Sequence, residues 1–155
     1  PSVGKDLYRR SLYTFWRRAM APPTMFLLDA PDREFCNVGV KRTNTPLQAL
    51  ATLNETGFFE AARMFGERMI RAGESDGECL AFGFRCVASR PATERELQVL
   101  LDSLREYRRG FAAGTTDLLA VGEMKPSGDI ERAELAAFAA VANVLLNLDK
   151  TLTKE

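Results

Sequence analysis

Three carboxylates, Asp29, Asp32 and Glu34, lie within six consecutive residues of this chain. Because Ca²⁺ binds carboxylate and backbone oxygens that a single loop can supply, the cluster is a candidate calcium site. Its spacing does not follow the EF-hand pattern, however, and Arg33 lies in its middle. We therefore favour a structural interpretation, in which the acids cap helices and form ion pairs with nearby arginine and lysine residues. We expect no bound metal.

A second candidate site is the segment RTNTP at residues 42–46, which leads directly into an expected helix. Free backbone N–H groups at a helix start, together with a guanidinium and hydroxyls, can bind an anion. Ordinary capped helices carry the same polar atoms, because loop backbone needs hydrogen-bond partners, and we favour this simpler reading. The candidate interaction residues of both segments, with two amides that we expect to tie the following helix to the preceding segment, are Asp29, Asp32, Arg33, Glu34, Arg42, Asn44, Thr45, Gln48 and Asn54.

Aromatic and arginine side chains are interleaved at residues 8–18, near the start of the chain. Such a surface can stack bases or sugars, and Trp16 with Arg17 is its candidate centre. The net charge of the whole chain is zero, whereas nucleic-acid-binding domains are usually basic. Aromatic residues at helical spacing are also more typical of a core. We therefore expect no nucleic-acid partner, and a glycan remains an alternative ligand.

The sequence contains three cysteines and no histidine, so the commonest general base and metal ligand are absent. Cys79 and Cys86 would lie about 10 Å apart along one helix, at ~1.5 Å rise per residue, which is too far for a disulfide. We predict that Cys36, Cys79 and Cys86 are lone thiols that act as small core hydrophobes. A disulfide between Cys36 and either of the others is an alternative in an oxidising compartment.

Motifs that would mark a self-contained active site are missing from the sequence. There is no CxxC pair and no glycine-rich phosphate loop, and a hydrolytic triad of the usual kind is impossible without histidine. There is also no CxxCH sequence, so we expect no c-type haem within this chain. These absences favour a chain that has no catalytic centre or cofactor of its own.

Prolines divide the first third of the chain. Apolar residues at helix-like spacing predict a helix over residues 5–20, and Pro22 and Pro23 are expected to end it. Residues 21–45 are predicted to form an extended, irregular arm. This arm would hold the carboxylates and the polar segment described above.

The remainder of the chain shows helical periodicity with clear boundaries. Thr45 and Pro46 resemble a capped helix start, Asn54 could cap the next helix, and Thr93 with Glu96 forms a capping-box pattern. Alanines in the expected helix at 130–148 would allow close packing, so we place this helix at the centre of the bundle. The expected helices span residues 46–53, 56–71, 76–88, 93–114 and 130–148, with a short helical turn at 117–121. We predict an all-α, irregular bundle of about five to six helices with an extended N-terminal arm and no substantial sheet.

Composition is consistent with one globular domain of 155 residues, 46% of them apolar and 27% charged. A chain of this length buries roughly 68–70% of its unfolded surface, which is enough for an independent core. The longest apolar run, residues 135–146, is shorter than the ~20 residues that span a bilayer. We expect a single helical domain over 1–155, with a helix and arm at 1–45 and a bundle at 46–155. Because the chain opens without Met, we expect an excised piece of a larger polypeptide.

Several short stretches together resemble a known family. They are RRSLYTFWRR (9–18), APP (21–23), DAPDREFC (29–36), RTNTPLQAL (42–50), LNE (53–55), EAAR (60–63), SRPATERE (89–96) and NVLLNLDKTLTKE (143–155). On these motifs the chain is similar to the planctomycete-type secreted-protein domain of unknown function. That domain typically forms the C-terminal part of large exported proteins that carry cytochrome-c-like domains.

The resemblance implies an extracytoplasmic, multidomain parent with haem c held elsewhere in it, and no catalytic role for any residue here. Our leading hypothesis is a non-catalytic helical module that packs against other domains of the same polypeptide. An alternative is that residues 21–45 form one wall of a shared active site, for extracellular polysaccharide or for haem-linked redox chemistry. A third hypothesis is carbohydrate or anion binding through Trp16, Arg17 and the helix start at Thr45.

Overall fold

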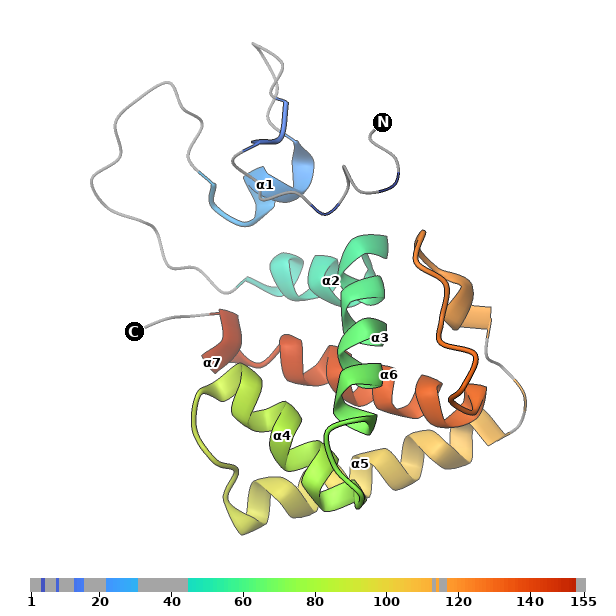
Figure 1. The fold of residues 1–155 in the computed structure, drawn as a ribbon. Coiled ribbons are helices and arrows are strands. Elements are labelled where there is room, and N and C mark those ends of the chain that lie inside the picture. Colours follow the sequence, from blue (N-terminus) through green and yellow to red (C-terminus); the bar gives the residue numbers. More distant parts are fainter. Residues whose placement is uncertain are drawn as a thin grey trace.

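The computed structural model describes residues 4, 8, 13–15, 22–30, 45–112, 114 and 117–152. The elements follow one another as α1 (Pro23–Leu27), α2 (Pro46–Asn54), α3 (Thr56–Ile70), α4 (Asp76–Ala88), α5 (Glu94–Ala112), the 3₁₀ turn η3 (Asp117–Ala120), α6 (Arg132–Leu146) and α7 (Asp149–Leu152). No strand occurs in this described part. The predicted all-α fold is therefore confirmed, and Figure 1 shows the arrangement of its helices.

Local capping explains where most helices begin. The Thr45 hydroxyl accepts a hydrogen bond from the Gln48 N–H, and the Gln48 side chain accepts one from the Thr45 N–H. Pro46 occupies the first turn, where its missing N–H costs nothing. Ser75 with Glu78 and Thr93 with Glu96 form the same reciprocal arrangement. The sequence-based starts of these three helices are confirmed.

The start of α3 differs from our expectation. Its N-cap is Glu55, whose carboxylate accepts hydrogen bonds from the N–H groups of Gly57 and Phe58, at 2.9 and 3.2 Å. Asn54 was the expected cap, but it is still the last residue of α2, and its side chain donates to the Leu50 carbonyl at 2.8 Å. A carboxylate at a helix start also gains from the helix dipole, which favours Glu55 in this position.

The predicted arm at 21–45 is wrong in one part, because residues 23–27 form α1. The sequence predicts that Pro22 and Pro23 end a helix, whereas in the structure Pro23 begins one. Proline at the first helical position needs no hydrogen bond and already has a helical φ, so it can start a helix as well as stop one. The helix expected at 5–20 lies mostly outside the described residues. Tyr8 and Tyr13 to Phe15, which are described, are not α-helical.

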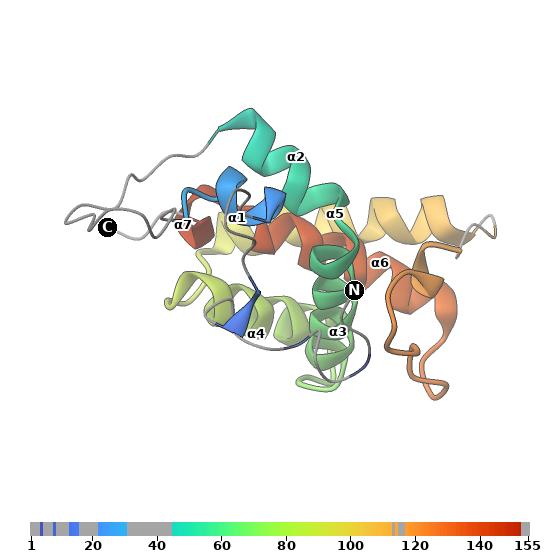
Figure 2. The same ribbon diagram turned by 90° about the horizontal axis from the view of Figure 1, so that it is seen from above.

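The core is built around α6, which runs through the centre of the bundle and is crossed by α3 (Figures 1 and 2). The alanines of α6 make this packing close: Ala136, Ala137, Ala139 and Ala142 have no exposed surface. At the crossing Gly66 lies so near α6 that a Cβ there would come within 2.9 Å of the Ala139 nitrogen. The predicted central position of the last helix is therefore confirmed.

One of the cysteine predictions is wrong. Cys79 is buried among core residues, with 5% of its surface exposed, but Cys86 is exposed, and both are free thiols. Seven residues correspond to nearly two helical turns, yet only Cys79 of the two lies against the core. Cys36 lies outside the described residues. Among the helices described, none is long and apolar enough to cross a membrane.

Candidate functional site

The predicted tie between α2 and the arm exists at Gln48. Its side-chain amide donates to the Leu27 carbonyl at 2.8 Å and to the Asp29 carboxylate at 3.0 Å. Gln48 is 5% exposed, so these bonds join α1 and α2 in a largely water-excluded position. Asn54 does not contribute to this tie, because its amide bonds within α2.

This geometry shows how three of the predicted site residues are used. Asp29 accepts a hydrogen bond from Gln48, and it occupies the left-handed region of backbone space, with φ of 56°. Thr45 is used as a helix cap. These contacts fit the structural interpretation that we preferred for both segments. The remaining predicted residues, which lie outside the described part of the chain, are Trp16, Arg17, Asp32, Arg33, Glu34, Arg42 and Asn44.

The described residues include no group of His, Cys, Asp or Glu side chains arranged to hold a metal ion. Two members of the candidate calcium cluster, Asp32 and Glu34, are not among the residues searched. The calcium hypothesis is thus untested by the structure.

Helix α2 has an inverted amphipathic character. Its inward side carries the polar residues Gln48 and Thr52, which are 5% and 7% exposed, and the Thr52 hydroxyl donates to the Asn147 side-chain oxygen at 2.6 Å. Its outward side carries Leu47 and Leu50, which are 59% and 58% exposed. Residues three apart share a helix face, so the two leucines form one exposed apolar stripe.

Helix α1 adds to the exposed apolar surface at this end of the molecule. Phe26 is 78% exposed and Leu28 is 40% exposed, and α1 contacts α2 (Figure 1). We call Phe26, Leu28, Leu47 and Leu50 the α1–α2 apolar surface. Single exposed apolar residues need no explanation, but grouped ones beside buried polar residues commonly mark an interaction site.

A buried charged network on α3 was not foreseen from the sequence. Arg63 is fully buried, and its two terminal nitrogens donate to the carbonyls of Leu119, at 2.6 Å, and Met124. Glu60 accepts a hydrogen bond from the Met124 N–H at 2.6 Å and another from the Tyr8 hydroxyl at 2.9 Å.

One further turn along α3, Glu67 accepts a hydrogen bond from the Ser127 N–H at 2.8 Å. Glu60, Arg63 and Glu67 therefore hold residues 119–127 against α3 through backbone groups. The spacing of the three charges on one helix face was the only available signal for this network. Most of its partners are backbone atoms some 60 positions away in the chain, for which sequence gives no pattern.

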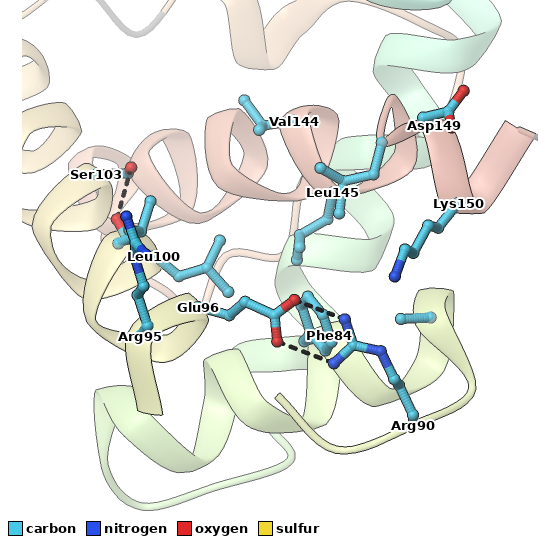
Figure 3. Close-up of a pocket in the computed structure, with 13 residues that line it drawn as sticks. Phe84, Arg90, Arg95, Glu96, Leu100, Ser103, Val144, Leu145, Asp149 and Lys150 are labelled. Atoms are coloured by element: carbon cyan, nitrogen blue, oxygen red, sulfur yellow. Dashed lines mark hydrogen bonds and ion pairs between the residues drawn. The ribbon is translucent and has the colours of Figure 1, made fainter. Parts of the chain in front are cut away.

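A pocket of about 500 Å³ opens between α4, α5, α6 and α7 (Figure 3). Its walls are mainly apolar, and the ion pair between Arg90 and Glu96 lies beside it with an N–O distance of 2.6 Å. The Arg90 guanidinium also lies over the Phe84 ring, 4.9 Å from its centre. Arg90 hydrogen-bonds Glu96 and thereby holds the pKa of that carboxyl far below its ordinary value.

Within the described residues, the fold is a helical bundle with exposed apolar side chains on α1 and α2, an apolar pocket between α4, α5, α6 and α7, and a buried network that secures a loop. Residues 1–104 match the family PSD1, described as a protein of unknown function (DUF1553), and the chain belongs to this family. The match includes α1 to α4 and part of α5, and the motif at 143–155 lies beyond it. The comparisons found no matching curated protein and no matching solved structure.

Proposed function

We propose that this chain is a non-catalytic helical packing module, which docks through its α1–α2 apolar surface onto another domain of the same, larger polypeptide. The observation that carries the proposal is the inverted character of α2, with Gln48 and Thr52 inside and Leu47 and Leu50 outside. Hydrogen bonds to Leu27, Asp29 and Asn147 satisfy the inward polar groups, so the orientation of α2 is well determined. The exposed leucines are then available for a partner.

The energy available from such docking supports this reading. Fully burying a leucine or phenylalanine side chain is worth about 1.5–3 kcal/mol relative to leaving it in water. Three large side chains that are each more than half exposed, Phe26, Leu47 and Leu50, can therefore contribute several such increments. Residues of this kind form the centre of protein interfaces.

The family resemblance supplies the proposed context. The motifs that resemble the planctomycete-type secreted-protein domain suggest an exported parent that carries cytochrome-c-like domains. On this proposal the partner surface belongs to one of those other domains, and the chain works outside the cytoplasm. Any haem would be bound elsewhere in the parent, where CxxCH sequences could hold it.

The test is calorimetric titration of this chain with the separately expressed remainder of its polypeptide. The chain should bind, and Leu47→Gln with Leu50→Gln should weaken binding by at least about tenfold, since 1.4 kcal/mol corresponds to tenfold. Val99→Gln is the matched control, because Val99 is also 58% exposed but lies on α5. Undiminished binding by the double variant, or no binding by the unaltered chain, would refute the proposal.

A further inference from the structure

The pocket between α4, α5, α6 and α7 has the features of a ligand site that is separate from the α1–α2 apolar surface. Phe84, Leu100 and Leu145 are buried residues of its floor, and Leu148 also lines it. Its volume of about 500 Å³ falls in the range of about 300–1,000 Å³ that is common for small-molecule sites. Two residues of its wall, Val99 and Val144, remain 58% and 40% exposed.

The exposure of Val144 is unusual for its helix. Most of the other apolar residues of α6 are buried in the core, whereas Val144 lines the pocket and is partly exposed. Val99 faces it from α5. Apolar side chains from two helices are thus exposed to water in the pocket. A ligand with an apolar body would cover both of these side chains.

The neutral and acidic polar groups that line the pocket already have partners. Glu96 accepts two hydrogen bonds from Arg90, at 2.9 and 2.6 Å, and further ones from Thr93. The Ser103 hydroxyl donates to the Val99 carbonyl of its own helix at 2.8 Å. A sugar or an extended peptide needs many hydrogen-bond partners when it is buried, and this pocket offers few.

Two cations at the pocket rim are different. Arg95 and Lys150 are exposed and form no ion pair or hydrogen bond with any residue that the structure describes. Figure 3 shows Lys150 extending from α7 towards the Arg90–Glu96 pair, with Arg95 on α5 at the opposite side. Asp149 also lines the pocket but has a partner of its own, so the unpaired charges at the rim are the two cations beside the apolar floor.

We propose that this pocket binds an amphipathic anion of the fatty-carboxylate class, with its alkyl chain on the apolar floor and its carboxylate at the Arg95 and Lys150 rim. An alkyl chain forms no hydrogen bonds, so it is suited to the mainly apolar walls of the pocket. Both cations of the rim attract an anionic head group, which can contact either of them, since they lie at opposite sides of the pocket. Charge complementarity thus selects this ligand over a neutral or a cationic one with the same tail.

The probes are decanoate, decanol and decyltrimethylammonium, which share an alkyl tail and differ in head-group charge. Each is titrated into the full chain by calorimetry, below its micellar concentration. Decanoate should bind saturably at one site and more tightly than the other two. Arg95→Gln with Lys150→Gln should weaken decanoate binding roughly threefold to tenfold, as expected for exposed charges, and should leave decanol binding unchanged.

A second variant separates the pocket from other apolar surfaces. Val144→Trp should fill the pocket from a partly exposed position and abolish the binding of decanoate and decanol alike. Leu47→Gln with Leu50→Gln is the matched control, because it removes exposed apolar surface elsewhere, and it should not affect either ligand. Circular dichroism confirms that each variant is folded.

Three outcomes would overturn the proposal. The first is the absence of saturable decanoate binding, as expected if a protein segment covers the pocket. The second is equal binding of all three head groups. The third is decanoate binding that Val144→Trp leaves intact while the α2 variant abolishes it, which would place the ligand on the α1–α2 apolar surface.

Discussion

Arg63 is the clearest case in which one residue secures a distant part of the chain. Its guanidinium is fully buried and donates to two loop carbonyls, while its Nε has no hydrogen-bond partner. Replacing it with Met would remove both bonds and leave buried Glu60 without the nearby positive charge. We expect Arg63→Met to lower the free energy of unfolding by about 3–5 kcal/mol, measured by urea denaturation.

The matched control for this prediction is Arg109→Met. Arg109 forms an ion pair with Glu106 at 3.2 Å, but its side chain is 74% exposed. Exposed pairs contribute little to stability, so this variant should unfold at nearly the same urea concentration as the unaltered chain. Equal effects of the two substitutions would show that the buried network does not hold the loop.

Arg108 makes stability depend on pH through Asp76. It donates hydrogen bonds of 2.6 and 2.7 Å to the Asp76 carboxylate, and these lower the pKa of Asp76 below its ordinary value of 3.8. A lowered folded-state pKa means that the stabilisation is complete well above 3.8 and is lost as the pH falls through and below that value. Asp76→Asn should therefore cost more stability at about pH 7 than at about pH 3. Urea unfolding at both pH values measures this difference, and an equal cost at both would contradict the assignment.

At the residue scale, sequence reasoning found contacts that depend on near neighbours. The capping of α2 by Thr45 and the tie through Gln48 were foreseen, because both follow from the start of that helix. The roles of Arg63 and Arg108 were not, since their partners lie more than 25 positions away. Nothing in a single sequence states which distant carbonyl or carboxylate a buried arginine will meet.

The crossing of α3 and α6 is the packing contact on which the bundle depends. A Cβ at Gly66 would meet backbone atoms of Phe138 and Ala139 at 3.0 and 2.9 Å, and helix backbone cannot move aside cheaply. We expect Gly66→Ala to destabilise the chain by about 1–3 kcal/mol, as overpacking does, and thermal unfolding measures this loss.

Gly110→Ala is the control for that prediction. Gly110 lies within α5, and no atom lies within 4 Å of a Cβ at this position. Because alanine favours helix over glycine, this variant should be more stable by up to about 1 kcal/mol. If Gly66→Ala were also stabilising, this would contradict the close packing of α3 against α6 at Gly66.

At the scale of elements, the sequence predicted helices better than it predicted their ends. Periodicity and capping boxes located α4 and α5, because both signals are local. Pro22 and Pro23 were ambiguous, since proline can precede a helix as well as terminate one. Asn54 was the expected cap of α3, but it is the last residue of α2, and Glu55 caps α3 instead.

At the scale of the whole molecule, the residues that the structure describes include two surfaces suited to binding. The α1–α2 apolar surface exposes leucines over buried polar groups, and the pocket on other residues combines apolar walls with unpaired cations. The all-α class could be predicted from helical periodicity, and the central place of α6 from its alanine content. The exposure of Leu47 and Leu50 could not, because an apolar residue on a helix is normally expected to face the core.

The measurement that most directly tests the packing role is hydroxyl-radical footprinting of this chain, alone and within its complete polypeptide. Oxidation rates report the accessibility of individual side chains, including Phe26, Leu47 and Leu50, with Val99 as an exposed reference. We predict that the first three are oxidised readily in the chain alone and become strongly protected in the complete polypeptide, while Val99 stays reactive. Equal oxidation of Leu47 and Leu50 in both forms would contradict the proposal that this surface docks on another domain.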